Sequence, residues 1–271
     1  MPRLAANLSF FFKELPVLQR FGAAARAGFR RTEFMFAGDT GYEVNASSVK
    51  AELQKYSLTH ELLNAPAGDW LSGERGMAGL PGRDADFKAS IEYGLQFASQ
   101  IGCNKMHVMA GLADRGATAE TFVERLRWAS TMAADANVTL CVEPLNAKDF
   151  PGYLIPDMPT ALKLLDAIDS KHCKLQLDLY HVAMSAIASG RPTPDSAELA
   201  QAVRDYLPRA AHVQIANPPG RNEPGVGDVD FPPLLRLLDD LGYEGAVGCE
   251  FRPSTPTTEG ALGWASEYLL E

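Results

Sequence analysis

The chain has 271 residues, of which 46% are hydrophobic and 22% charged, and its formal net charge at pH 7 is -9. This composition excludes a disordered chain and supplies the apolar side chains for one large core. Because its lysines and arginines are scattered, the basic face that a nucleic-acid-binding protein needs is not expected.

Short apolar runs alternate with longer amphipathic segments along the whole chain. The runs resemble buried parallel strands, which read as near-continuous apolar stretches. Eight candidate strands occur, at Leu4–Leu8, Arg31–Phe36, Leu58–Asn64, Lys105–Ala110, Thr139–Glu143, Lys174–Leu179, His212–Ala216 and Ala246–Phe251. Helical periodicity lies between them, most clearly at Phe122–Ala133, Ala161–Ile168 and Leu234–Leu241.

Glycine marks the predicted helix ends. Gly28, Gly102 and Gly242 each follow a helical segment and precede an apolar strand, and glycine readily adopts the left-handed conformation that ends helices. The alternation of strand and helix predicts a parallel sheet. Eight repeats predict closure into an α/β fold of one domain, a (β/α)8 TIM barrel over residues 1–271.

Two glycine-rich segments interrupt the alternation. Residues 66–83 follow the third predicted strand, and residues 217–230 follow the seventh. Both loops leave the carboxyl ends of strands, which in a barrel form the active-site face. We therefore expect them to contribute to a functional site, although long surface loops are also tolerated without one.

Four polar residues stand near the carboxyl ends of apolar strands. They are Glu143, Asp178, Gln214 and Glu250, separated by 35, 36 and 36 residues. One strand–helix unit has about this length here, so four adjacent strands would direct these side chains to a common point. One such polar residue alone would be interpreted as a hydrogen-bonded strand end, whereas three carboxylates and one amide at matched spacing favour a functional centre.

Three carboxylates in one pocket repel one another unless they are protonated or bridged by a cation. The spacing therefore predicts that Glu143, Asp178, Gln214 and Glu250 hold one divalent metal ion. A ligand set made only of oxygen atoms favours Mg²⁺ or Mn²⁺ over zinc.

Other polar residues near these strand ends are candidates for substrate binding. His107 lies on the fourth predicted strand, 36 residues before Glu143, and His181 begins the loop after the sixth. Arg221 and Arg252 lie beyond the seventh and eighth strands. A guanidinium group can bind a substrate carboxylate through two hydrogen bonds. A core histidine or a solvated surface arginine remains the alternative for each.

The cysteines and the first residues of the chain indicate the cellular compartment to expect. Cys103, Cys141, Cys173 and Cys249 form no Cys-X-X-Cys pair, and two of them lie inside apolar runs, so a disulfide framework is not expected. The first residues form no apolar signal segment, and no apolar run is long enough to span a membrane. We expect a cytoplasmic protein without a membrane partner.

At these residues the sequence resembles the hydroxypyruvate isomerase family, within the xylose isomerase-like barrels, which includes 2-oxo-tetronate isomerases. The resemblance runs nearly the whole chain. It is carried by Ala-Ala-Asn-Leu-Ser (5–9), Pro-Ala-Gly-Asp-Trp and Gly-Glu-Arg-Gly (66–76), Leu-Pro-Gly-Arg (80–83), Met-Ala-Gly (109–111), Glu-Pro-Leu-Asn (143–146), Asp-Leu-Tyr-His (178–181), Pro-Gly-Arg-Asn-Glu-Pro-Gly (219–225) and Gly-Cys-Glu-Phe-Arg-Pro (248–253).

The resemblance implies a metal-assisted isomerase of the aldose–ketose type. Its substrate would be a small hydroxy-oxo acid, either hydroxypyruvate, which gives tartronate semialdehyde, or a 2-oxo-tetronate. Glu143 and Glu250 would be the acid/base pair, and both would also belong to the metal site with Asp178 and Gln214. Related sugar epimerases usually have histidine where Gln214 stands, which favours the isomerase branch.

The loop after the seventh strand departs from the family pattern. Asn217 replaces an aspartate, Pro218 an asparagine and Asn222 a histidine, and Asp228 stands where glutamate is common. The proposed metal residues are unchanged, so the reaction type is expected to persist. The altered loop leaves the identity of the short oxo-acid or sugar open.

Three other functions compete with this interpretation. A ketose 3-epimerase-like enzyme on the same scaffold would invert one carbon with the same two glutamates. A metal-dependent endonuclease usually needs several metals, many histidines and a basic groove, which five histidines and a charge of -9 do not favour. A non-catalytic binding protein would gain little from clustered carboxylates. Barrels of this kind often form homo-oligomers, but no interface pattern is evident.

Overall fold

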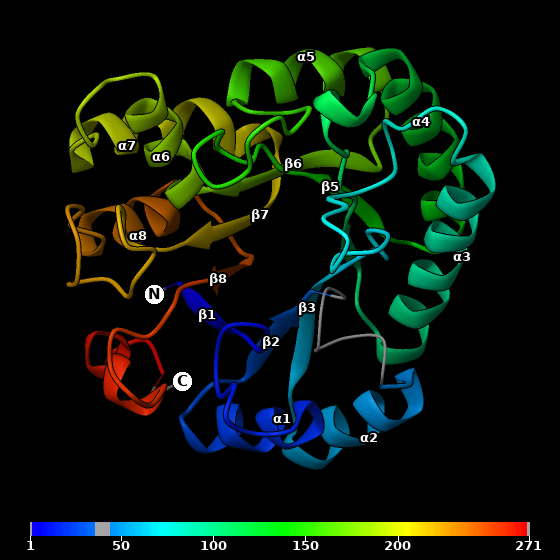
Figure 1. The fold of residues 1–271 in the computed structure, drawn as a ribbon. Helices are drawn as coiled ribbons and strands as arrows, with labels where there is room; N and C mark the ends of the chain where they lie inside the picture. The colour runs from blue at the N-terminus through cyan, green and yellow to red at the C-terminus, as the bar shows by residue number, and fades with distance from the viewer. Residues whose placement is uncertain (1, 36–43, 270–271) are drawn as a thin grey trace.

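A computed structural model describes residues 2–35 and 44–269. Their eight strands form one closed barrel in chain order, and every neighbouring pair is parallel (Figure 1). The strands are β1 (Arg3–Asn7), β2 (Arg31–Phe34), β3 (Thr59–Asn64), β4 (Lys105–His107), β5 (Thr139–Val142), β6 (Cys173–Asp178), β7 (Ala210–Ile215) and β8 (Ala246–Cys249). The predicted (β/α)8 barrel is confirmed.

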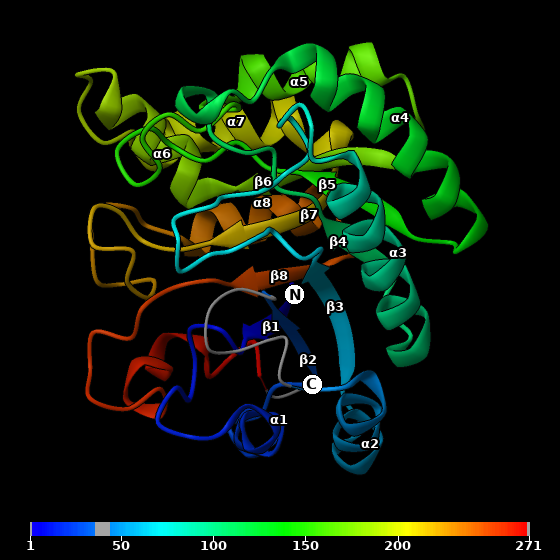
Figure 2. The same ribbon diagram turned by 45° about the vertical axis from the view of Figure 1, so that its right-hand side comes forward.

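Helices surround the barrel in an outer layer (Figures 1 and 2). They are α1 (Val17–Arg26), α2 (Ala46–Tyr56), α3 (Asp84–Ile101), α4 (Ala119–Asp135), α5 (Met158–Ile168), α6 (Leu179–Ala188), α7 (Ser196–Tyr206) and α8 (Pro232–Asp240). The short 3₁₀ turns are η1 (Ala113–Arg115), η2 (Leu207–Arg209), η3 (Glu259–Ala261) and η4 (Gly263–Ala265). Both α6 and α7 lie between β6 and β7, whereas the described segment after β8 contains only η3 and η4.

The predicted helix ends are confirmed at the three glycines. Gly28, Gly102 and Gly242 have φ values of 100°, 74° and 75°, which lie in the region where a side chain would be strained. The chain can therefore leave each helix sharply and enter β2, β4 and β8.

Most predicted strands extend too far at their carboxyl ends. The fifth was expected to include Glu143 and the eighth Glu250, but β5 ends at Val142 and β8 at Cys249. Pro144 has no N–H to donate to a sheet ladder, so the chain leaves the sheet beside Glu143. Both glutamates are thus the first residues of loops. The last predicted residue of the second strand, Phe36, lies outside the described residues.

A cluster of aromatic side chains anchors the loops at the carboxyl end of the barrel. Phe11, in the loop after β1, is fully buried and packs against Phe251 with ring centroids 4.7 Å apart and against Phe29 at 6.0 Å. The backbone N–H of Phe12 donates to Thr258 Oγ1 at 2.7 Å. These contacts tie the β1 and β8 loops together and hold the residues beside them over the barrel.

The four cysteines are buried and free, as expected. Within the described part of the chain, no helix has both the length and the apolar character needed to cross a membrane.

Candidate active site

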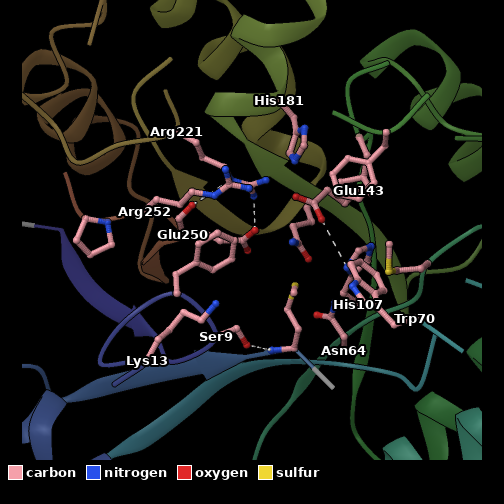
Figure 3. Close-up of a pocket in the computed structure, with 17 residues that line it drawn as sticks. Ser9, Lys13, Asn64, Trp70, His107, Glu143, His181, Arg221, Glu250 and Arg252 are labelled. Carbon is pink, nitrogen blue, oxygen red and sulfur yellow. Dashed lines mark hydrogen bonds and ion pairs between the residues drawn. The ribbon is translucent and has the colours of Figure 1, made fainter. Parts of the chain in front are cut away.

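A cavity of about 440 Å³ opens at the carboxyl end of the strands (Figure 3). This volume is typical of pockets for small molecules. Its lining includes six of the eight residues that the sequence singled out: Glu143, Glu250, His107, His181, Arg221 and Arg252. Of these, Arg252 is exposed. Asp178 and Gln214 are fully buried beneath these residues.

Figure 3 shows Glu143 and Glu250 on opposite sides of the cavity. Glu143 follows β5 and Glu250 follows β8, so they enter from strands that are not neighbours in the barrel. Both are largely buried, at 4% and 7% exposure. A small molecule in the cavity would lie between two carboxyl groups that are shielded from bulk water.

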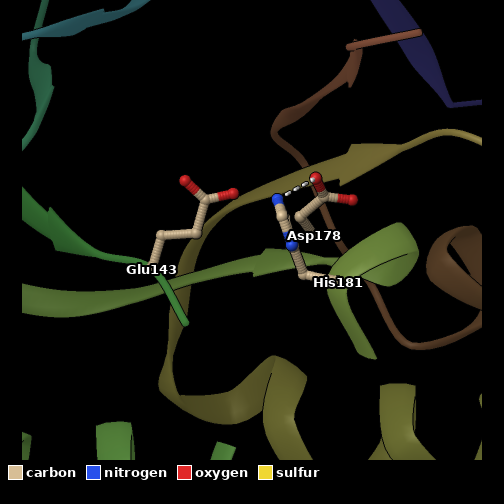
Figure 4. Close-up of side chains that lie close together, drawn as sticks. All are labelled: Glu143, Asp178 and His181. Carbon is tan, nitrogen blue, oxygen red and sulfur yellow. Dashed lines mark ion pairs between the residues drawn. The ribbon is translucent and has the colours of Figure 1, made fainter. Parts of the chain in front are cut away.

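Glu143, Asp178 and His181 form a cluster in which one potential ligand atom from each lies within 4.8 Å of the others (Figure 4). Asp178 ends β6 and caps α6, since its Oδ1 accepts the Tyr180 N–H at 2.8 Å. Its Oδ2 accepts no hydrogen bond from the described residues, and neither does Glu143 Oε1. Two buried carboxylate oxygens are therefore available to a ligand.

Glu250 is held from below by two amides. Asn7 Nδ2 donates to Glu250 Oε2 at 3.1 Å and Gln214 Nε2 donates to the same oxygen at 2.7 Å. The other oxygen, Oε1, forms a short ion pair with Arg221. The carboxylate of Glu250 is thus fixed at both oxygens. Among the described residues, the carboxylate of Glu143 has one polar side-chain contact, at 3.5 Å between its Oε2 and His107 Nδ1.

Arg221 is a buried arginine at the roof of the site. It lies in the β7–α8 loop with φ of 58° and is 7% exposed. Its guanidinium lies 4.8 Å from the Tyr180 ring centroid and 5.1 Å from that of Phe10, and one nitrogen is 3.7 Å from Asp178 Oδ2. Burial lowers the pKa of Arg221, but the nearby carboxylates of Glu250 and Asp178 outweigh it and raise that pKa. Arg221 therefore remains charged.

The carboxyl groups have raised pKa values. Burial raises the pKa of Glu143 well above its ordinary value, and the charges of Glu250 and Asp178 raise it further. Burial raises the pKa of Glu250 to about 8 and that of Asp178 to about 6, although Arg221 opposes both shifts. One guanidinium does not balance these carboxylates. The two oxygens that accept no hydrogen bond, Glu143 Oε1 and Asp178 Oδ2, together with the raised pKa values fit a site for a divalent cation, which would favour the ionised forms.

His181 acts as a hydrogen-bond donor toward the cavity. Its Nδ1 accepts the backbone N–H of Asn146 at 3.1 Å, so in the neutral ring Nε2 carries the proton. Burial lowers the pKa of His181 well below its usual range, which keeps the ring neutral. Nε2 has no hydrogen-bond partner among the described residues. This tautomer suits a bond to a ligand oxygen better than coordination of a metal.

The four strand-end residues that are about 36 positions apart in the sequence do not lie at the same level along the barrel axis. Asp178 and Gln214 are direct partners in the sheet, but Gln214 is paired with Gly248, two residues before Glu250. Val142 is paired with Leu175, so Glu143 lies beside Gln176. The stagger between strands that closes a barrel accounts for this offset. It also places Gln176, which the sequence pattern did not identify, in the cavity wall.

The departures in the β7–α8 loop lie away from the cavity. The side chain of Asn217 bonds both backbone groups of Val229 at 2.9 Å, and its backbone pairs with Asn222. Asn222 Nδ2 donates to the carbonyl of Arg252 at 2.9 Å. Neither residue lines the cavity, and nor does Pro218. These residues shape the loop that carries Arg221 and would affect a substrate only through that loop.

Both glycine-rich loops reach the site. Residues 66–83 place Trp70 in the cavity wall, where the Arg75 guanidinium stacks 3.8 Å above its ring. The β1 loop contributes Lys13, which the sequence did not single out. Lys13 and Arg252 lie on the Glu250 side of the cavity, away from Trp70 (Figure 3). The cavity mouth therefore has a cationic side and an aromatic side.

Residues 21–269 match the family model described as xylose isomerase-like TIM barrel. The chain is 41% identical to the 2-oxo-tetronate isomerase of Cupriavidus necator, with 99% of both chains covered. It is 36% identical to the hydroxypyruvate isomerase of Escherichia coli, with 99% of this chain and 100% of the relative covered.

Among solved structures, that of an AP endonuclease of family 2 from Brucella melitensis superposes with a TM-score of 0.90 at 38% identity and 99% coverage of both chains. The D-psicose 3-epimerase of Clostridium cellulolyticum is more distant. Its TM-score is 0.69 at 18% identity, with 96% of this chain and 88% of that chain covered, so it is similar in fold alone.

Proposed function

The chain belongs to the xylose isomerase-like TIM barrel family, and we propose that it is an isomerase that moves the carbonyl group of a small hydroxy-oxo acid to the neighbouring carbon. Hydroxypyruvate and a 2-oxo-tetronate are the candidate substrates, because two relatives that match over nearly their full length are named hydroxypyruvate isomerase and 2-oxo-tetronate isomerase. The observation that supports the reaction most strongly is the pair Glu143 and Glu250, which are buried and line one small cavity from opposite sides (Figure 3).

The proposed reaction transfers two protons through an enediol of the substrate. For hydroxypyruvate, a carboxylate removes one proton from the hydroxymethyl carbon, and a proton is returned to the former carbonyl carbon. A second proton moves from the hydroxyl oxygen to the carbonyl oxygen, so the product, tartronate semialdehyde, has the same atoms. Two carboxyl groups whose pKa values are raised by burial can each hold or release a proton.

Glu143, Asp178 and Glu250 would hold a Mg²⁺ or Mn²⁺ ion, and the amide oxygen of Gln214 would be a fourth ligand. When bound, such an ion supplies positive charge that lowers the carboxyl pKa values and polarises the substrate carbonyl. Gln214 Oε1 accepts from Gln176 Nε2 at 2.6 Å, and a carbonyl oxygen has a second lone pair for a ligand.

Four side chains would bind and orient the substrate. Arg221 and Arg252, on the Glu250 side, would bind the carboxylate through charged hydrogen bonds. His181 would donate from Nε2 to a substrate oxygen. His107, whose pKa burial lowers to about 3, would remain neutral and hold Glu143 from the aromatic side.

The test is an NMR assay of the purified protein in D₂O with Mg²⁺ or Mn²⁺, against hydroxypyruvate, 2-oxo-tetronates and neutral short ketoses. The proposal predicts carbonyl migration with deuterium incorporation on an acid, lost in EDTA and restored by the metal. Inversion at one carbon without migration would instead identify an epimerase. No turnover and no exchange on any candidate would contradict the proposal.

Similarity to the Brucella melitensis AP endonuclease structure calls for one further control. An abasic-site DNA duplex is incubated with the protein and the same metals. No cleavage is expected, because a net charge of -9 and a small cavity lined by buried carboxyl groups oppose binding of a phosphate backbone. Metal-dependent strand cleavage would favour the endonuclease.

A further inference from the structure

Glu33 is a fully buried carboxylate in the barrel interior that does not line the cavity. It lies on β2, and three donors from other strands converge on it. Asn7 Nδ2 and Gln214 Nε2 donate to its Oε1 at 3.0 and 2.7 Å, and His212 Nε2 lies 2.6 Å from its Oε2. Burying a carboxylate costs free energy unless it is hydrogen-bonded, so a buried carboxylate with partners at both oxygens indicates a structural or functional role.

Two of these donors also bind the proposed catalytic glutamate. Asn7 and Gln214 each use one amide nitrogen to bridge Glu33 Oε1 and Glu250 Oε2. The orientation of the Asn7 amide is fixed independently, because its Oδ1 accepts the backbone N–H of Ser9 at 3.0 Å. Gln214 Oε1 accepts from Gln176 Nε2, and both NH₂ groups face the two carboxylates.

The backbone of β8 leaves room for this arrangement. A Cβ atom added to Gly248 would lie 2.4 Å from Glu33 Oε1 and 2.7 Å from Gln214 Cγ, far closer than non-bonded atoms approach. Gly248 has no left-handed conformation that would require glycine. Its missing side chain is thus explained by the space that Glu33 and Gln214 occupy.

We propose that Glu33 is a positioning residue, which orients the amides of Asn7 and Gln214 so that they hold Glu250 Oε2 and leave Glu250 Oε1 to Arg221 and the cavity. This inference rests on the proposed isomerase function, in which Glu250 handles a proton. Both amides share one acceptor, Glu33 Oε1, so a side chain without that oxygen leaves the two NH₂ groups without their common partner. The amides could then rotate, and Glu250 would lose part of its support.

The test compares Glu33→Ala with wild type and with Glu61→Ala, using whichever acid the wild-type protein isomerises. Partners that orient catalytic or metal-binding groups typically change activity by about 10–100-fold. Glu33→Ala, which removes the shared acceptor, is therefore expected to lower kcat by about 10–100-fold with KM within about threefold. Glu61 lies on β3 and pairs with Arg31 and Lys105 at 3.0 and 3.1 Å. Glu61→Ala removes a strand carboxylate that does not line the cavity and should leave kcat unchanged.

A second variant keeps Glu33 in place. Asn7→Ala removes one of the two bridges and is expected to lower kcat by about 3–10-fold. If Glu33 acts through these amides, the double variant should lose less than the product of the two single losses, as expected for residues in one network. Fully multiplicative losses, or a normal kcat in folded Glu33→Ala, would overturn the inference. An inactive wild-type protein would instead refute the proposed function.

Discussion

The metal-free protein is predicted to lose stability as the pH rises from 5 to 8, and a divalent cation is predicted to reduce that loss. The reason is the raised pKa of Glu250, about 8 in the fold against an ordinary value of 4.5. Between these values the unfolded chain releases a proton that the folded protein retains. The folded state binds more protons over this interval, so the free energy of unfolding falls as the pH rises.

The size of the effect follows from the same two values. Each pH unit between 4.5 and 8 lowers the free energy of unfolding by about 1.4 kcal/mol for one such carboxyl group, or about 5 kcal/mol over the interval. For a chain of this size 1 kcal/mol corresponds to about 2–4 °C in Tm. Glu250 should therefore contribute about 3–6 °C per pH unit. Asp178, with its pKa raised to about 6, adds to the fall below that pH.

Thermal unfolding followed by circular dichroism at half-unit steps from pH 5 to 8, in EDTA, measures this slope. The control is Glu250→Gln, whose amide does not titrate, so its slope should be shallower by the contribution of Glu250. Adding Mg²⁺ or Mn²⁺ to the wild-type protein should flatten the slope, because the cation binds the ionised carboxylates. Equal slopes for wild type and Glu250→Gln, or a slope that the cations leave unchanged, would refute this reasoning.

Three further outcomes are expected. Lys13→Ala and Arg252→Ala should each raise KM for the acid about 3–10-fold in steady-state assays, because both cations line one side of the cavity. KM for a neutral ketose should not change, and equal changes for both substrates would contradict carboxylate binding. Arg221→Lys should lower kcat/KM about 10–100-fold, since an ammonium lacks the fork that reaches Glu250 and Asp178 together; unchanged kcat/KM would refute it. Phe11→Ala should lower the free energy of unfolding by about 3–5 kcal/mol in urea titrations. Tyr93→Ala, at a 41% exposed position, should lower it much less. Similar losses in the two variants would contradict the role of the Phe11 cluster as an anchor.

The barrel could be predicted because its signals are local and repeated. Buried parallel strands produce continuous apolar runs, and glycine at positions such as Gly28 and Gly102 marks where the chain turns back into the sheet. Strand ends were less predictable. Glu143 and Glu250 extend apolar runs in sequence, but the ladder ends one residue before each, which the hydrophobic pattern does not reveal.

The polar support beneath the site was missed for a geometric reason. The polar strand-end residues stand out in the sequence through separations of about 36 residues, as between Gln214 and Glu250, but Asn7 and Glu33 are only 26 residues apart because the first strand–helix unit is short. Glu33 in Arg-Thr-Glu-Phe was a signal, since it is a carboxylate inside a predicted strand. Its partners come from other strands and could be identified only in three dimensions.

The central claim is that Glu143 and Glu250 form the acid/base pair, and kinetics of Glu143→Gln, Glu250→Gln and the double variant on the identified acid test it most directly. Each single variant, folded by circular dichroism, is predicted to lose about 10²–10⁴-fold in kcat. The double variant should lose little more, because the two groups act on one proton-transfer sequence. Near-normal turnover in either folded single variant would contradict the claim.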